Sequence, residues 1–277
     1  MEPMAIGMFV NFGRGVEVCL KEAQELGIAT IQALAPPASA RTAADIAKTK
    51  KACAAAGIRI TVVFCGFEGE SYADIPTVHR TVGLVPPATR AARLAETKAI
   101  SDYAKALGVE AIAMHIGAVP EDPANPEYAK IVDAARAVCD HAGRNNQRFH
   151  LETGQETADC LLRFIRDVKR DNLAVNFDPA NMILYGVGEP LPALRKVGRY
   201  VKSCHLKDAT WSPVKGEWGR EVPLGQGAVG VRDFVKTLKE IGYGGPLTIE
   251  REISGPAQLE DIRAAKELLE RVKREIV

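Results

Sequence analysis

Four stretches of the chain decide its fold: "RFHLETG" (148–154), "NLAVNFDPAN" (172–181), "VKSCHLKD" (201–208) and "PLTIERE" (246–252). Each is an apolar run of the length of a buried strand. Each also ends on a carboxylate or an imidazole, and these groups are Glu152, Asp178, His205 and Glu250. Because the same kind of side chain closes all four runs, we expect the four strand ends to serve one purpose.

Strand-like and helix-like runs alternate along the rest of the chain as well. Strands are expected at 4–12, 28–34, 58–66 and 109–117 before the four named above, and helices at 15–27, 41–57, 89–108, within 125–146, and at 155–169, 189–198, 231–241 and 256–273. Regular alternation requires parallel strands, because each helix carries the chain back to the same edge. The pattern predicts an α/β protein with one (β/α)₈ TIM barrel over residues 1–277, with a doubly wound open sheet as the competing fold.

Composition excludes several classes of protein. A formal net charge of +1 over 277 residues does not indicate the strongly basic surface that binds nucleic acid. The segment "MEPMAIGMFVNFGRG" (1–15) is not expected to be a signal peptide, and no run is apolar enough to cross a membrane. The six cysteines lack CxxC spacing and are expected to be buried free thiols. These features predict a cytoplasmic protein that binds neither nucleic acid nor membrane.

Two connections are too long for simple turns. They span 66–88, after the third strand, and 209–230, after the seventh. Both are expected on the C-terminal rim of the barrel, where active sites are built, as lids or specificity loops. "GQGAVG" (225–230) matches the GxGxxG pattern of dinucleotide sites, but the short, proline-broken "EVPL" before it favours a rim loop near a bound sugar instead.

The strand ends predict a metal site. Three carboxylates and one imidazole converging at the tops of strands five to eight need a partner, since buried charges are costly when they are unpaired. A divalent cation would meet that need. One nitrogen and three carboxylates favour Mn²⁺, Mg²⁺ or Co²⁺ over a thiolate-rich structural zinc site.

The motifs "FHLETG", "NFDPAN", "CHLKD" and "GPLTIERE" resemble those of the xylose-isomerase-like TIM-barrel superfamily of sugar isomerases and epimerases, over essentially the whole chain. The resemblance implies that Glu152, Asp178, His205 and Glu250 hold one divalent ion. Mn²⁺ is the expected ion, with Mg²⁺, Co²⁺ or Zn²⁺ as alternatives. The chain departs from the ketose 3-epimerase branch, which carries a histidine and an arginine where Asn181 and Trp211 stand. Its five histidines also do not supply the trinuclear zinc site of the endonuclease IV branch.

The expected reaction is isomerisation or epimerisation of a sugar or keto-sugar through an enediolate, with Glu152 and Glu250 as paired acid and base. His115, at the end of strand four, is either structural or an additional acid or base. Lys207, Asn181, Trp211 and Glu252 are expected to bind substrate. A lyase or dehydratase acting by β-elimination on a keto-sugar, 3-keto-glycoside or inosose is the alternative, and a non-catalytic sugar-binding barrel is a remote one. A homo-oligomer remains open.

Overall fold

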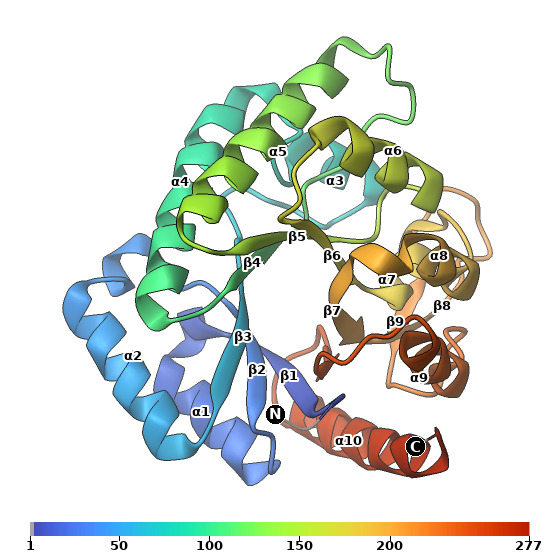
Figure 1. Ribbon diagram of the computed structural model, residues 1–277. Coiled ribbons are helices and arrows are strands. Elements are labelled where there is room, and N and C mark those ends of the chain that lie inside the picture. Colours follow the sequence, from blue (N-terminus) through green and yellow to red (C-terminus); the bar gives the residue numbers. More distant parts are fainter. Residues whose placement is uncertain (1–2, 277) are drawn as a thin grey trace.

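The computed structural model describes residues 3–276, which form a closed barrel of eight parallel strands (Figure 1). Neighbouring strands pair in the order β1-β10-β7-β6-β5-β4-β3-β2, and β2 returns to β1. This arrangement confirms the predicted TIM barrel; residues 1–2 and 277 of the predicted domain lie outside the described residues. The barrel strands are β1 (Ile6–Asn11), β2 (Thr30–Leu34), β3 (Arg59–Phe64), β4 (Ala111–Met114), β5 (Arg148–Glu152), β6 (Leu173–Phe177), β7 (Val201–Leu206) and β10 (Leu247–Ile249).

Helices surround the strands and match the predicted series closely. The capping box of Thr42 and Asp45 starts α2, and left-handed Gly57 and Gly108 end α2 and α4, as their positions in the sequence indicate. The outer helices are α1 (Val16–Glu25), α2 (Ala43–Ala56), α4 (Pro87–Leu107), α5 (Pro126–Arg144), α6 (Ala158–Val168), α8 (Pro190–Val197), α9 (Val231–Glu240) and α10 (Pro256–Ile276), with short 3₁₀ turns η1 (Phe12–Arg14), η2 (Ala38–Ala40) and η3 (Gly198–Tyr200).

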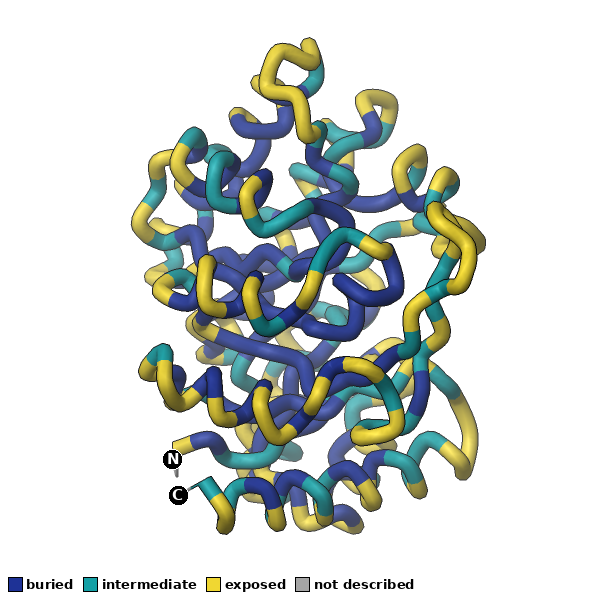
Figure 2. Tube along the Cα trace, turned by 90° about the vertical axis from the view of Figure 1, so that its right-hand side faces the viewer, coloured by how far each residue is buried: buried dark blue, intermediate teal, exposed yellow. Residues whose placement is uncertain are grey.

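The core lies between the strands and the helices, where Figure 2 shows a buried inner trace beneath exposed outer turns. The six cysteines are free, and all but Cys53 are buried. In the part of the chain that the structure describes, no helix is both long and apolar enough to cross a membrane.

The second half of the long connection after β3 packs against the barrel. It contains a short helix, α3 (Ile75–Thr81), and it buries Val78, Val82 and Leu84 completely. The backbone N–H of Leu84 donates to the carbonyl of Ile116 at 2.8 Å, which ties the segment to the end of β4. The part from Val78 to Leu84 is therefore packed into the fold, whereas no residue of 66–77 is buried. The expected role of 66–88 as a lid or specificity loop stays a prediction.

The other long connection carries a small antiparallel hairpin, β8 (Asp208–Thr210) with β9 (Arg220–Val222). The strand expected at 201–208 therefore ends at Leu206, and Asp208 already belongs to the hairpin. An unpredicted helix, α7 (Pro179–Tyr185), follows β6 directly. Every residue of α7 is buried, so it lacks the alternation of polar and apolar faces by which a helix is recognised in a sequence.

Candidate metal centre and substrate cavity

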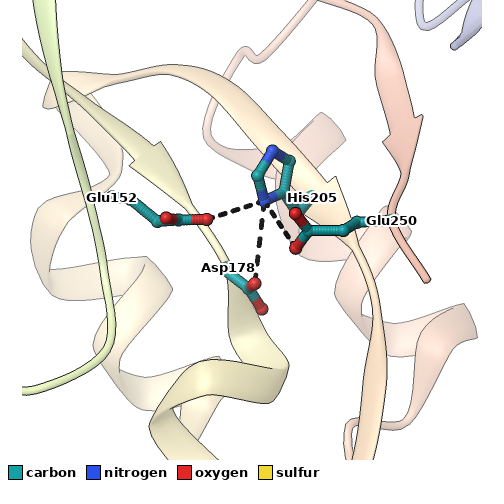
Figure 3. A group of neighbouring side chains, drawn as sticks. All are labelled: Glu152, Asp178, His205 and Glu250. Atoms are coloured by element: carbon teal, nitrogen blue, oxygen red, sulfur yellow. Dashed lines mark ion pairs between the residues drawn. The ribbon is translucent and has the colours of Figure 1, made fainter. Parts of the chain in front are cut away.

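The four predicted side chains meet at the C-terminal mouth of the barrel (Figure 3). Glu152 ends β5, Asp178 and Glu250 follow β6 and β10, and His205 lies within β7. The Nδ1 atom of His205 lies 2.9 Å from Glu152 Oε1, 3.1 Å from Glu250 Oε2 and 3.6 Å from Asp178 Oδ2. One ligand atom from each residue falls within 4.8 Å of all the others.

Two of these atoms lack any hydrogen-bond partner within the described chain. His205 Nδ1 and Asp178 Oδ2 are both buried and form no well-directed hydrogen bond, although their neighbours are close. Buried polar atoms are normally satisfied, so a pair of unsatisfied atoms facing one point indicates a missing ligand. Three carboxylate oxygens and an imidazole nitrogen fit a divalent cation of the Mn²⁺, Mg²⁺ or Co²⁺ type.

Asp178 has a fixed orientation because it also starts α7. Its Oδ1 atom accepts hydrogen bonds from the backbone N–H groups of Ala180 at 2.8 Å and Asn181 at 3.1 Å. Its own backbone N–H and C=O bond to the hydroxyl of Thr153 at the end of β5. Because Oδ1 is hydrogen-bonded to the first turn of α7 and the backbone of Asp178 to Thr153, Oδ2 is the oxygen that remains to bind a cation.

His205 is held by Gln32, a residue for which the sequence analysis predicted no role. Gln32 Oε1 lies 3.0 Å from His205 Nε2, while Gln32 Nε2 donates to Thr248 Oγ1 at 3.0 Å and to the Cys204 carbonyl at 3.5 Å. Because the carbonyl can only accept, the amide orientation is fixed, and His205 Nε2 must carry the hydrogen. This leaves the lone pair of neutral His205 on Nδ1, which points at the three carboxylates.

The aromatic rings of Phe9 and Phe64 complete the support of His205. Phe64 stacks on the imidazole with centroids 5.3 Å apart, and Phe9 meets it edge-on at 5.5 Å. The only sequence signal for Gln32 is a polar residue in the middle of the apolar strand "TIQAL" (30–34). Burying a glutamine costs free energy unless its amide is fully hydrogen-bonded, so a glutamine in an apolar strand indicates a specific polar contact.

The two glutamates have different electrostatic environments. Burial raises the pKa of Glu152 to about 7, and the neighbouring carboxylates reinforce the shift against the opposing effect of His205. Burial acts in the same direction on Glu250, but His205 and Lys207 outweigh it and hold the pKa of Glu250 below its usual value. The same carboxylates raise the pKa of His205 well above its ordinary value despite its burial. A bound cation would favour the ionised carboxylates and the neutral imidazole.

Lys207 is fully buried beside the metal ligands, with an exposed fraction of 1%. Its ammonium donates to Glu252 Oε1 at 2.7 Å, Glu250 Oε2 at 3.1 Å and Asn181 Oδ1 at 3.2 Å. Those three acceptors engage all its protons. Lys207 therefore orients the acidic residues and Asn181, and its expected contact with substrate stays a prediction.

A cavity of about 270 Å³ opens beside the metal centre. The loop after β3 contributes Tyr72 and the hairpin loop contributes Trp218 to its wall. Trp218 packs on Tyr185 with centroids 4.5 Å apart, and its indole N–H is buried without a partner in the described chain. The complete lining is Tyr72, His115, Glu152, Asn181, Leu184, Tyr185, Trp218, Gly219, Glu221 and Glu252.

His115 lies in this cavity wall, in contact with Gln155 and Tyr185. Its ring contacts the amide nitrogen of Gln155 and lies 3.3 Å from the Tyr185 hydroxyl. Burial, assisted by the positive charge of Lys207, lowers the pKa of His115 to about 3. The imidazole is therefore neutral near pH 7, which suits a hydrogen bond to a substrate hydroxyl better than delivery of a proton from an imidazolium.

One expectation for the connection after β7 needs correction. Trp211 does not line the cavity, and 39% of its surface is exposed; Trp218 takes that place because the β8–β9 hairpin turns it inward. The "GQGAVG" segment has its amides filled from within the chain. The Asp208 carboxylate accepts from the backbone N–H groups of Gly225 at 2.9 Å, Gly227 at 3.0 Å and Val229 at 3.1 Å.

Comparisons with known proteins agree with this architecture. A family model described as a xylose isomerase-like TIM barrel matches residues 20–274. A xylose isomerase domain protein from Planctomyces limnophilus is 52% identical, with 99% of each chain covered and a TM-score of 0.96. Among curated proteins, none matches the chain.

More distant solved structures share the fold alone. A xylose isomerase-like TIM barrel protein from Mycobacterium smegmatis in complex with magnesium is 21% identical over 98% of this chain and 96% of its own, with a TM-score of 0.72. D-Psicose 3-epimerase from Clostridium cellulolyticum H10, solved with D-tagatose, is 18% identical over 97% and 99% of the two chains, with a TM-score of 0.73. The matched family model and the close relative together show that the chain belongs to the xylose isomerase-like TIM barrel family.

Proposed function

We propose that the chain is a divalent-metal-dependent isomerase or epimerase of a sugar or keto-sugar. It would remove the proton α to a carbonyl and return it to the neighbouring carbon or to the opposite face. The observation that carries the proposal is the convergence of Glu152, Asp178, His205 and Glu250, with two buried atoms left unpartnered, next to a cavity with aromatic walls.

In this proposal the four residues hold one cation, for which Mn²⁺ is the expected ion and Mg²⁺, Co²⁺ or Zn²⁺ are alternatives. Bound there, the cation would supply electrophilic stabilisation of the negative charge that develops on the substrate oxygen. Glu152 and Glu250 extend from non-adjacent strands on different sides of His205, as Figure 3 shows. One carboxylate can therefore take the proton and the other return it.

The remaining residues of the cavity position the substrate. Tyr185 and Trp218 offer flat apolar faces for sugar C–H groups, and Asn181 and Glu252 offer polar atoms for hydroxyls. His115, neutral and hydrogen-bonded, orients a hydroxyl rather than protonating a leaving group. Tyr72 adds a further aromatic ring to the wall from the loop after β3.

Proton exchange tests the proposal directly. Mn²⁺-loaded protein in D₂O should incorporate deuterium α to the carbonyl of a free ketose, as read by NMR. Glu152→Gln and Glu250→Gln should each lower the exchange rate by about 100-fold or more. Glu240→Gln, the same substitution at the far end of α9, is the matched control and should leave the rate unchanged.

Two results would contradict the proposal. Metal-free protein that exchanges the proton as fast as loaded protein would remove the cation from the reaction. Appearance of an unsaturated product instead of an isomer would assign the chain to the elimination alternative, because the same proton abstraction then expels a β-substituent.

A further inference from the structure

We infer that the substrate is an uncharged, polyhydroxylated molecule, and that the site discriminates against phosphorylated and carboxylated sugars. This inference deepens the proposed function and rests on it. Two independent observations carry it: the charges around the cavity, and the way the chain fills its own anion-binding backbone groups.

The cavity wall is acidic. Glu152, Glu221 and Glu252 line it, and none of the lining residues in the described chain is lysine or arginine. An anionic substituent would lie beside these carboxylates, which Lys207 and Arg251 neutralise only in part, and it would meet no uncommitted cation in the lining of the cavity. Hydroxyl groups fit this wall better, since they can donate to the carboxylates.

The nearby cations are already committed to carboxylates of the chain. Lys207 binds Glu250 and Glu252, as described above. The guanidinium of Arg251 pairs with Glu221 at 2.9 Å and with Asp261 at 2.8 Å. Recruiting either cation to a phosphate would take it away from a largely buried carboxylate, Glu250 or Glu221, and an unpaired buried charge is costly.

Carboxylates of the chain also occupy backbone amides in two loops of the rim. TIM barrels that bind phosphate commonly do so with the loops after strands seven and eight. In the loop after β7, the Asp208 carboxylate occupies the amides of Gly225, Gly227 and Val229. A Cβ at Gly227 would lie 2.1 Å from Asp208 Oδ1, so glycine is required for this close approach.

In the loop after β10, one backbone amide is engaged in the same way. The Glu221 carboxylate accepts the backbone N–H of Glu252 at 2.9 Å. The chain therefore supplies its own anions, Asp208 and Glu221, at the backbone groups where a phosphate would otherwise bind. The glycine-rich segment that suggests a nucleotide site in the sequence is satisfied internally.

Matched pairs of ligands test the inference. Binding to Mn²⁺-loaded protein is measured by calorimetry for D-fructose and D-tagatose, each compared with its 6-phosphate, so that only the charged group differs within a pair. The free sugar should bind about 100-fold more tightly than its phosphate. In Glu221→Gln this ratio should fall by about 10-fold, because one wall charge is removed. Glu240→Gln, at the opposite end of the barrel, should keep the wild-type ratio.

A phosphate that binds as tightly as its free sugar, or more tightly, would overturn the inference, while deuterium exchange would still report on the proposed chemistry. A protein that binds neither member of either pair would overturn it too, because the cavity would then not accept neutral sugars. Exchange in D₂O is scored separately, so the loss of the proposed function is distinguishable from the loss of charge selection.

Discussion

Replacement of Gln32 by methionine is the sharpest test of how the metal centre is built. Methionine has nearly the length and volume of glutamine, so the substitution removes hydrogen bonds without opening a large cavity. His205 Nε2, which lies 3.0 Å from Gln32 Oε1, would lose its acceptor in a fully buried site. Without that acceptor, no hydrogen bond fixes the tautomer of His205 that carries its lone pair on Nδ1, where the cation is expected.

The magnitude follows from the same contact. A buried donor left without a partner costs about 1–3 kcal/mol. Loss of a group that orients a metal ligand weakens metal binding by about 10- to 100-fold, which is about 1.4–2.7 kcal/mol and agrees with the first figure. We therefore expect the Kd for Mn²⁺, measured by calorimetry on chelator-stripped protein, to rise by about 10- to 100-fold in Gln32→Met.

Ser203→Ala is the matched control for this experiment. Ser203 lies on the same strand as His205, and its hydroxyl bonds His150 Nδ1 at 2.8 Å without contacting the metal ligands. Its loss should lower the Tm as Gln32→Met does but leave the Kd for Mn²⁺ within about 2-fold, since only a structural hydrogen bond disappears. Wild-type metal affinity in Gln32→Met, or an equal loss in Ser203→Ala, would refute the assignment of Gln32 as the residue that positions His205.

Three further predictions follow from buried groups. Burial raises the pKa of Glu156 from 4.5 to about 8. The folded form therefore loses stability relative to the unfolded chain as the pH rises between these values, so Glu156→Gln should gain stability over wild type across that window. The gain should reach the order of 3–5 kcal/mol above pH 8, and equal pH profiles of Tm would contradict it. His115→Asn should lower deuterium exchange and turnover together by about 10-fold, as expected for a hydroxyl contact; preserved exchange with lost product would point to elimination instead. Leu84→Ala should destabilise the protein by about 2–5 kcal/mol in urea unfolding, whereas a change below about 0.5 kcal/mol would show that this part of 66–88 does not pack into the core.

The sequence by itself determined the barrel and predicted the four residues of the candidate metal centre. Strand and helix periodicity is local: apolar runs of strand length and glycine stops such as Gly57 and Gly108 are visible within a few residues. Eight alternating strand–helix units with parallel strands leave few possible folds, and in a barrel the C-terminal ends of all the strands lie at one rim. That is why Glu152, Asp178, His205 and Glu250 could be brought together without coordinates.

Tertiary structure alone decided what surrounds those ligands. Gln32 lies 173 positions before His205 in the chain, and only barrel closure places it beneath the imidazole. The choice between Trp211 and Trp218 depended on a hairpin of three-residue strands, which is too short to be read from residue alternation. The hydrogen-bond partners of Lys207 and of the "GQGAVG" amides also depend on which carboxylates the fold brings next to them. Such contacts join residues that are distant in sequence, and their energy depends on burial and on a partner's orientation, neither of which a linear pattern contains.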